Sequence, residues 1–332
     1  MGRKRMHLLN LLRLAAILLV INSHCDPLYP IPALATGGAL GNALFFILSG
    51  YLLKLDGSFF GHMGRRIARL YPGMIIMLTA DVLRGGTKIP SLKEALLNYV
   101  WPTAFWFVGA IVLFDILAFG LSKLRFQEHF GRFSLFMAVL YFAAYFLIVD
   151  KSVWSVEEPG LRNPAQWFKL IYYFYIYALG FCLSSGPKKT TRMQPKTLLI
   201  LALAFAAGSV GIKGLFVRRP ELLAFQFLPQ LMGIAFSLLA LLWALAGEER
   251  YLEITPVGFR KTVDMLANLS LEVYLTQFMA IDLCKGLAFP LNMVLMLAGT
   301  FGAAYPLWKI DRWAQKALCG LFFHESKGGT AA

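Results

Sequence analysis

The chain has 332 residues, of which 58% are hydrophobic and only 15% are charged, and its mean hydropathy is +0.63. Soluble domains carry about 25% charged residues, so this composition argues against a soluble enzyme and indicates an integral membrane protein. The formal net charge of +14 is distributed as short basic clusters between apolar runs. That distribution fits loops at the surface of a lipid bilayer, and we expect no nucleic-acid partner.

Ten apolar runs of roughly membrane-spanning length follow one another along the chain. They cover residues 8–25, 34–53, 70–84, 99–120, 133–149, 167–185, 197–214, 225–246, 267–284 and 288–308. The third run is short and contains Asp81. The first follows a basic N-terminus, as a signal peptide does, but Arg13 interrupts it and no small-residue cleavage site follows closely. We therefore interpret it as the first membrane helix.

The distribution of lysine and arginine gives the orientation. If the N-terminus is inside, the inside connections hold about twice as many basic residues as the outside ones. The predicted fold class is all-α: a polytopic integral membrane helical bundle of about ten transmembrane helices, with both termini cytoplasmic. Residues 1–312 form the predicted transmembrane domain. Residues 313–332 form a predicted cytoplasmic tail that begins as an amphipathic helix and ends in disordered small residues.

The first apolar run contains two polar residues, Arg13 and His24, which are eleven residues apart. Eleven helical steps come to within about 20° of three full turns, so both side chains lie on one face, about 16 Å apart along the axis. One interpretation is that Arg13 reaches the cytoplasmic headgroups and His24 marks the outer interface. The other is functional, because an imidazole shielded from bulk water suits general-base catalysis. No second metal ligand lies at helical spacing from His24, so we expect no metal.

Two further stretches lie on either side of the second connection. "GGALGNALFFILSGYLL", residues 37–53, contains small residues that let membrane helices approach closely. "GRRIARLYP", residues 64–72, places Arg65, Arg66 and Arg69 just before an apolar run. These arginines either anchor the helix on the cytoplasmic side or clamp an anionic ligand, since guanidinium groups bind phosphates with two hydrogen bonds.

Four segments resemble the motifs of membrane acyltransferase family 3, which includes polysaccharide O-acetyltransferases. "RLAAILLVINSH" is similar to the family's Arg-x10-His motif, and "FFILSGYLL" to its "FFVLSGFL" segment. "RRIARLYP" resembles its arginine-rich cytoplasmic loop, and "SLEVYLTQ" resembles its "SYxIYLxH" helix. Gln277 departs from the pattern, because many members have histidine there. No esterase-like domain follows the helices, so the chain resembles the stand-alone members.

This resemblance implies a membrane-bound O-acyltransferase of the cell envelope, in the inner membrane. It would move an acetyl (acyl) group from cytoplasmic acetyl-CoA to a sugar hydroxyl of an extracytoplasmic or lipid-linked glycan, such as a polysaccharide. His24 would be the catalytic histidine and Arg13 its companion, while Arg65, Arg66 and Arg69 would contact the CoA phosphates. The resemblance leaves open whether His24 acts as a base or carries the acyl group, and which acceptor is used.

The remaining intramembrane charges need partners. These residues are Asp81, Asp115, Glu272 and Asp282. Each either belongs to a structural ion pair or serves the site, by pairing with Arg13 or by orienting the donor. The same charges leave two alternatives open: a transporter or flippase for a lipid-linked or anionic substrate, and a membrane-anchored assembly or sensory protein without chemistry.

Overall fold

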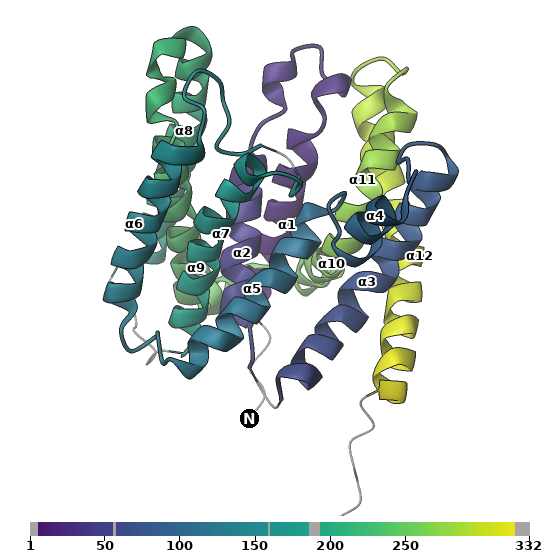
Figure 1. Cartoon of the computed structure of the whole chain (residues 1–332), viewed down its shortest axis with the longest axis horizontal. Coiled ribbons are helices and arrows are strands. Elements are labelled where there is room, and N and C mark those ends of the chain that lie inside the picture. The colour runs from purple at the N-terminus through teal and green to yellow at the C-terminus, as the bar shows by residue number, and fades with distance from the viewer. Residues whose placement is uncertain (1–5, 56–57, 159, 186–192, 323–332) are drawn as a thin grey trace, which may run out of the picture.

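A computed structural model describes residues 6–55, 58–158, 160–185 and 193–322, and over these residues the chain is a bundle of helices without strands (Figure 1). The α-helices are α1 (His7–Ser23), α2 (Gly38–Leu52), α3 (Phe59–Leu83), α4 (Leu92–Ala95), α5 (Trp106–Lys123), α6 (Phe130–Ile148), α7 (Pro164–Ser185), α8 (Pro195–Arg218), α9 (Leu228–Ile254), α10 (Val257–Asn268), α11 (Ser270–Cys284) and α12 (Leu291–Phe322). Short 3-10 or π segments are η1 (Asp26–Leu28), η2 (Pro32–Leu34), η3 (Leu96–Val100) and η4 (Pro220–Phe225).

All ten predicted runs fall on helices, and the polytopic all-α prediction is confirmed. Within the described ranges, seven helices are long and apolar enough to cross a membrane: α2 together with η2, and α5, α6, α7, α8, α9 and α12. The other three predicted runs fall on α1, α3 and α11. α1 and α11 are shorter, with 17 and 15 residues, and α3 carries the arginines of the "GRRIARLYP" stretch.

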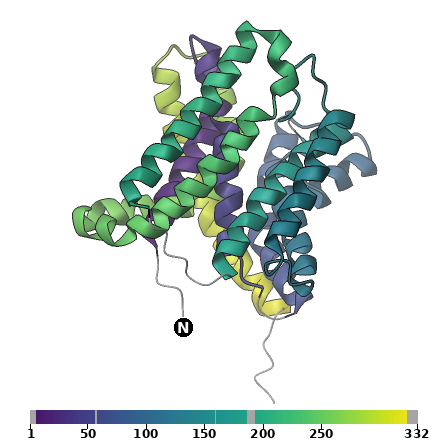
Figure 2. The same cartoon turned by 90° about the vertical axis from the view of Figure 1, so that its left-hand side faces the viewer.

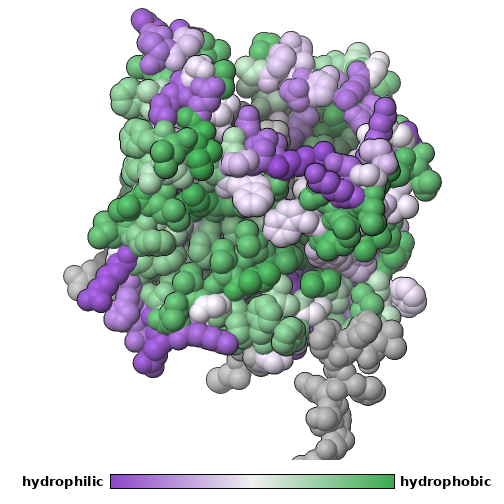
Figure 3. Space-filling model, viewed as in Figure 1, coloured by the Kyte–Doolittle hydropathy of each residue, from purple (hydrophilic) through white to green (hydrophobic). Residues whose placement is uncertain are grey.

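The surface of the bundle has the polarity of a membrane protein. On the face shown in Figure 3, apolar side chains form a band across the middle, and polar side chains gather toward the two ends. Many large apolar side chains are exposed, Leu147 to 85% and Val217 to 84%. Apolar patches of this extent mark contact with a nonaqueous partner, so the bilayer is the environment that this band fits.

Helix α2 is packed against α1, α7 and α9. Its contact with α7 is closest where Gly50 faces Tyr177 and Gly180 faces Ile47. A Cβ atom built on Gly50 would lie 1.9 Å from the Tyr177 carbonyl oxygen, and one on Gly180 would lie 2.1 Å from the Ile47 carbonyl oxygen. The two backbones therefore touch, as the small residues of 37–53 predict for this part of the bundle.

The first turn of α1 is held by carboxylates from α9 and α10. The backbone amides of His7 and Leu8 donate to the Glu248 carboxylate, at 2.7 and 2.9 Å. Asp264 accepts a hydrogen bond from Asn10 Nδ2 at 2.7 Å and lies 2.9 Å from His7 Nδ1. Helix α10, which the sequence did not predict as a separate element, lies crosswise to the bundle in Figure 2.

α1 begins and α12 ends at the same end of the bundle (Figures 1 and 2). α12 is one continuous helix that extends through residues 313–322. The boundary after residue 312 and the cytoplasmic tail stay predictions, and residues 323–332 lie outside the described part of the chain.

Candidate active site

A cavity of about 240 Å³ lies between α1, α2, α3, α5 and α11. Its polar lining is strongly basic and, in the described part of the chain, contains no carboxylate; the cationic or titratable members are Arg13, Lys54, His62, Arg66 and Arg69. Its apolar walls include Val20, Phe45, Leu48, Phe107, Val108 and Ile111. An excess of positive charge over an apolar wall fits a ligand that carries both an anionic group and an apolar or neutral arm.

The charged side chains gather toward one end of the cavity, whereas apolar side chains line it along its length. Lys54 follows the last turn of α2 and His62 is in the first turn of α3, at the end of the bundle where α1 begins. Val20, Asn42 and Phe107 lie near the other ends of α1, α2 and α5. At 1.5 Å per residue, Arg13 and Val20 are separated by about 10 Å along α1. The cavity is therefore elongated along α1, and we refer to its basic end as the mouth.

Arg13 and Arg69 share an electrostatic environment with Glu272 of α11. Arg13 Nη2 also donates to Ser270 Oγ at 3.2 Å, whereas Arg69 has no hydrogen bond or ion pair within the described ranges. Glu272 is only 5% exposed and does not line the cavity. The two arginines thus line the cavity, and the Glu272 carboxyl group that interacts with both lies outside the lining.

Arg66 is paired with Asp115 of α5, by contacts of 2.7 Å from Nε to Oδ2 and 3.4 Å from Nη2 to Oδ1. Asp115 also accepts a hydrogen bond from the hydroxyl of Tyr177, in α7. Arg65 is exposed and is not among the cavity residues. The structure therefore gathers Arg13, Arg66 and Arg69 at one cavity but does not bring Arg65 into it.

His24 lies just beyond the far end of the cavity. It caps the C-terminus of α1, is not part of the lining, and packs its ring against Phe278 with 4.8 Å between ring centroids. Val20 precedes His24 by four residues on α1, and Tyr274 precedes Phe278 by four on α11. One helical turn, about 6 Å, therefore separates the cavity end from His24.

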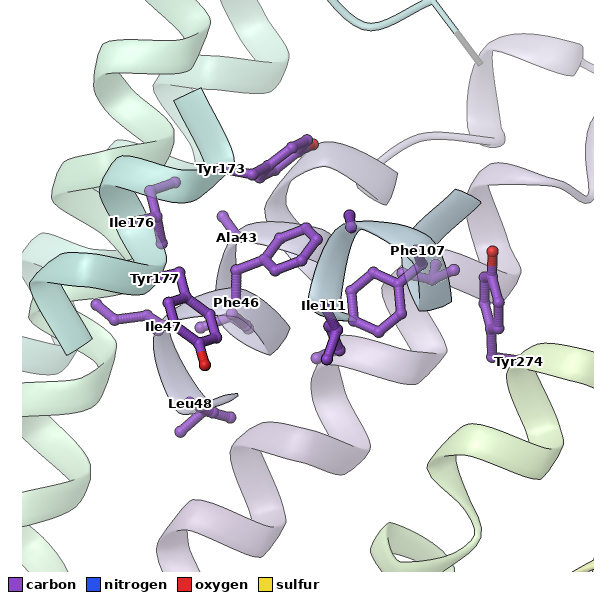
Figure 4. Packing of buried hydrophobic residues seen from close by; sticks show 14 of the residues in the cluster. Ala43, Phe46, Ile47, Leu48, Phe107, Ile111, Tyr173, Ile176, Tyr177 and Tyr274 are labelled. Atoms are coloured by element: carbon purple, nitrogen blue, oxygen red, sulfur yellow. The ribbon is translucent and has the colours of Figure 1, made fainter. Parts of the chain in front are cut away.

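The wall at this end is aromatic. Figure 4 shows Tyr274 of α11 opposite Phe107 and Ile111 of α5, with 5.6 Å between the Tyr274 and Phe107 ring centroids. Gln277, in the same helix, is fully buried and donates through Nε2 to the Tyr274 carbonyl oxygen at 3.1 Å. Gln277 is thus buried within the bundle, close to this aromatic wall.

His62, which lines the cavity, is not among the candidate residues of the sequence analysis. The available signal was spacing: His62, Arg66 and Arg69 follow one another at intervals of four and three residues, which places them on one helix face.

The other intramembrane charges predicted from the sequence have ion-pair partners of their own. Asp81 and Asp282 both contact Arg84, at 2.6 and 2.9 Å, and so connect the C-terminal ends of α3 and α11.

Comparison with known proteins agrees with the motif resemblance. A family model described as an acyltransferase domain, that of acyltransferase family 3, matches residues 6–309, which is nearly the whole chain. No curated protein and no solved structure gives a match.

Proposed function

The chain belongs to acyltransferase family 3, and from this premise we propose that it transfers an acetyl group from acetyl-CoA to a sugar hydroxyl of an extracytoplasmic or lipid-linked glycan. The observation that carries the proposal is the cavity, which is basic at its mouth, apolar along its length and ends one helical turn from His24. An acyl donor and a potential base are thereby aligned along a single helix, α1.

The donor fits the cavity by its chemistry. CoA consists of a phosphate-rich nucleotide joined to a long neutral arm that ends in a thioester. Arg66, Arg69 and Lys54 would hold phosphate groups at the mouth, where guanidinium groups form charge-assisted hydrogen bonds. The apolar walls would enclose the arm and direct the thioester toward Val20 and Tyr274. Since the mouth lies where α1 begins, the donor would enter from the cytoplasm of a cell with the protein in its inner membrane.

His24 would act on the acceptor. Its ring nitrogen would take the proton of the sugar hydroxyl as the hydroxyl oxygen attacks the thioester carbonyl carbon. The carbon–sulfur bond then breaks, and the thiolate of CoA leaves through the cavity. Arg13, about 16 Å away along α1, is too far from His24 to share in that proton transfer, so it would hold the donor from the middle of the cavity.

Acetyl-CoA consumption tests this reaction directly. Membranes that contain the protein should transfer label from acetyl-labelled acetyl-CoA to glycan, detected as a mass increase of one acetyl group per modified sugar. Membranes without the protein are the control. If the protein moves a lipid-linked substrate across the bilayer but leaves acetyl-CoA intact, the transporter alternative replaces this proposal.

Replacing Arg69 by glutamine is expected to weaken CoA binding about 10- to 100-fold, because a charge-assisted contact to phosphate is lost. Arg65→Gln is the matched control: it removes the same charge four residues away, outside the cavity, and should change the affinity less than about twofold. Equilibrium binding of CoA to the purified protein in lipid nanodiscs measures both. Equal losses in the two variants would show that the cavity is not the phosphate site.

A further inference from the structure

The carboxylate of Asp115 is completely buried, although it belongs to a membrane helix. Its side chain is 0% exposed, and an unpaired charge there would be strongly unfavourable. Arg66 of α3 supplies the opposite charge and Tyr177 of α7 supplies a hydroxyl donor. His62 Nε2 lies 3.5 Å from the same carboxylate, from one turn earlier on α3. Asp115 is therefore a junction between three helices and two cavity-lining side chains.

The pairing leaves part of each cavity side chain available. Arg66 uses Nε and Nη2 toward Asp115, and Nη1 has no hydrogen-bond or ion-pair partner in the described ranges. Arg66 is 22% exposed and His62 is 11% exposed, both as part of the cavity lining. Buried ion pairs contribute little net stability compared with apolar packing. Orientation of the two side chains is thus a better account of Asp115 than stability alone.

We propose that His62 is a further donor-binding residue of this cavity, and that Asp115 is a positioning residue that aims Arg66 and His62 at the anionic group of the donor. This inference rests on the proposed function, because it takes the anion to be a phosphate of CoA. His62 donates a ring N–H to a phosphate oxygen at the mouth, beside the free edge of the Arg66 guanidinium. Asp115 acts only through those two groups and does not touch the donor.

A double-mutant cycle on CoA affinity tests the positioning role. Asp115→Asn should weaken CoA binding about tenfold in the otherwise unchanged protein. In the Arg66→Gln, His62→Gln background the same substitution should change the affinity less than about twofold, since its two targets are gone. Acetyl-CoA turnover should show the loss as a raised KM with kcat within about twofold. Full additivity of the losses, or a loss confined to kcat, would overturn the positioning role.

His62→Gln, made alone, tests the binding role and should weaken CoA binding several-fold, whereas His129→Gln, at an exposed histidine outside the cavity, should leave it unchanged. Tyr177→Phe removes a single hydrogen bond to Asp115 without altering the lining, and it replaces Asp115→Asn if that variant fails to fold. An unchanged affinity in His62→Gln, with the expected loss in Arg69→Gln, would refute this inference and spare the proposed function. Failure of the wild-type protein to bind CoA would refute both.

Discussion

Replacing His24 by alanine is expected to reduce acetyl transfer to glycan by about 10²- to 10⁴-fold, the range that general-base catalysis supplies. CoA affinity should stay within about twofold of the wild-type value, because His24 lies about one helical turn beyond the cavity that is proposed to bind the donor. Label transfer from acetyl-CoA measures the first quantity, and equilibrium binding of CoA measures the second. We therefore expect His24→Ala to lower acetyl transfer without lowering the affinity for CoA.

His129→Ala is the control for this experiment. It removes an imidazole from an exposed position at the start of α6, so both transfer and binding should remain unchanged. A second comparison, Phe278→Leu, keeps an apolar side chain but removes the ring that packs on His24, and should lower transfer by a smaller factor than His24→Ala. Undiminished glycan acetylation in His24→Ala would remove the histidine from the mechanism.

Replacing Gly50 or Gly180 by alanine is expected to destabilise the protein by more than about 4 kcal/mol, which is exceptional for a single methyl group. The added Cβ would lie 1.9 or 2.1 Å from a backbone carbonyl oxygen of the facing helix. No side chain can turn away to make room, so α2 and α7 must separate along their length, and apolar contacts of neighbouring residues are lost with them. Thermal unfolding of the detergent-solubilised protein, followed by loss of monodisperse material, measures the effect.

Gly120→Ala adds the same methyl group, but we do not expect it to destabilise the protein. Gly120 lies in α5, and within the described residues nothing beyond its own helix backbone and chain neighbours lies within 4 Å of an added Cβ. Alanine should therefore be tolerated or should stabilise the helix by about 0.5–1 kcal/mol. A Gly180→Ala protein as stable as the Gly120→Ala protein would mean that the two backbones do not touch in the membrane.

The helices were largely predictable because each apolar run is a local signal. A run of about 20 apolar residues indicates a membrane helix wherever it stands in the fold. α10 was missed because it is short and amphipathic, with Val263, Asp264 and Ala267 buried against the bundle, and it lies within a polar connection. The three helices outside the set of seven clear membrane spans, α1, α3 and α11, carry most of the cationic and titratable side chains of the cavity.

The site was predictable only in part, because only some of its residues give a local signal in the sequence. Arg13, Arg66 and Arg69 stood out because charge within or beside an apolar run is costly and therefore conspicuous. The pairing of Arg66 with Asp115 was not visible, since it joins α3 to α5 across 49 positions of sequence. Because one edge of the Arg66 guanidinium contacts Asp115, that edge cannot bind a ligand. The motif alone does not reveal this. The exclusion of Arg65 from the cavity likewise depends on how α3 is rotated against its neighbours.

The anchoring of α1 by Glu248 has a practical consequence for handling the protein. A carboxylate that accepts from the first free amides of a helix also stands at the positive end of its dipole, so the cap of α1 is supplied from α9 rather than from the residues just ahead of it. An affinity tag or reporter domain fused ahead of Met6 therefore need not disturb the helix that carries Arg13 and His24. A chain break between α9 and α10 would be a different matter. The Glu248 cap would stay within the first fragment, but Asp264 would belong to the second. Reassembly of the fragments would then depend on restoring the contacts of Asp264 with His7 and Asn10.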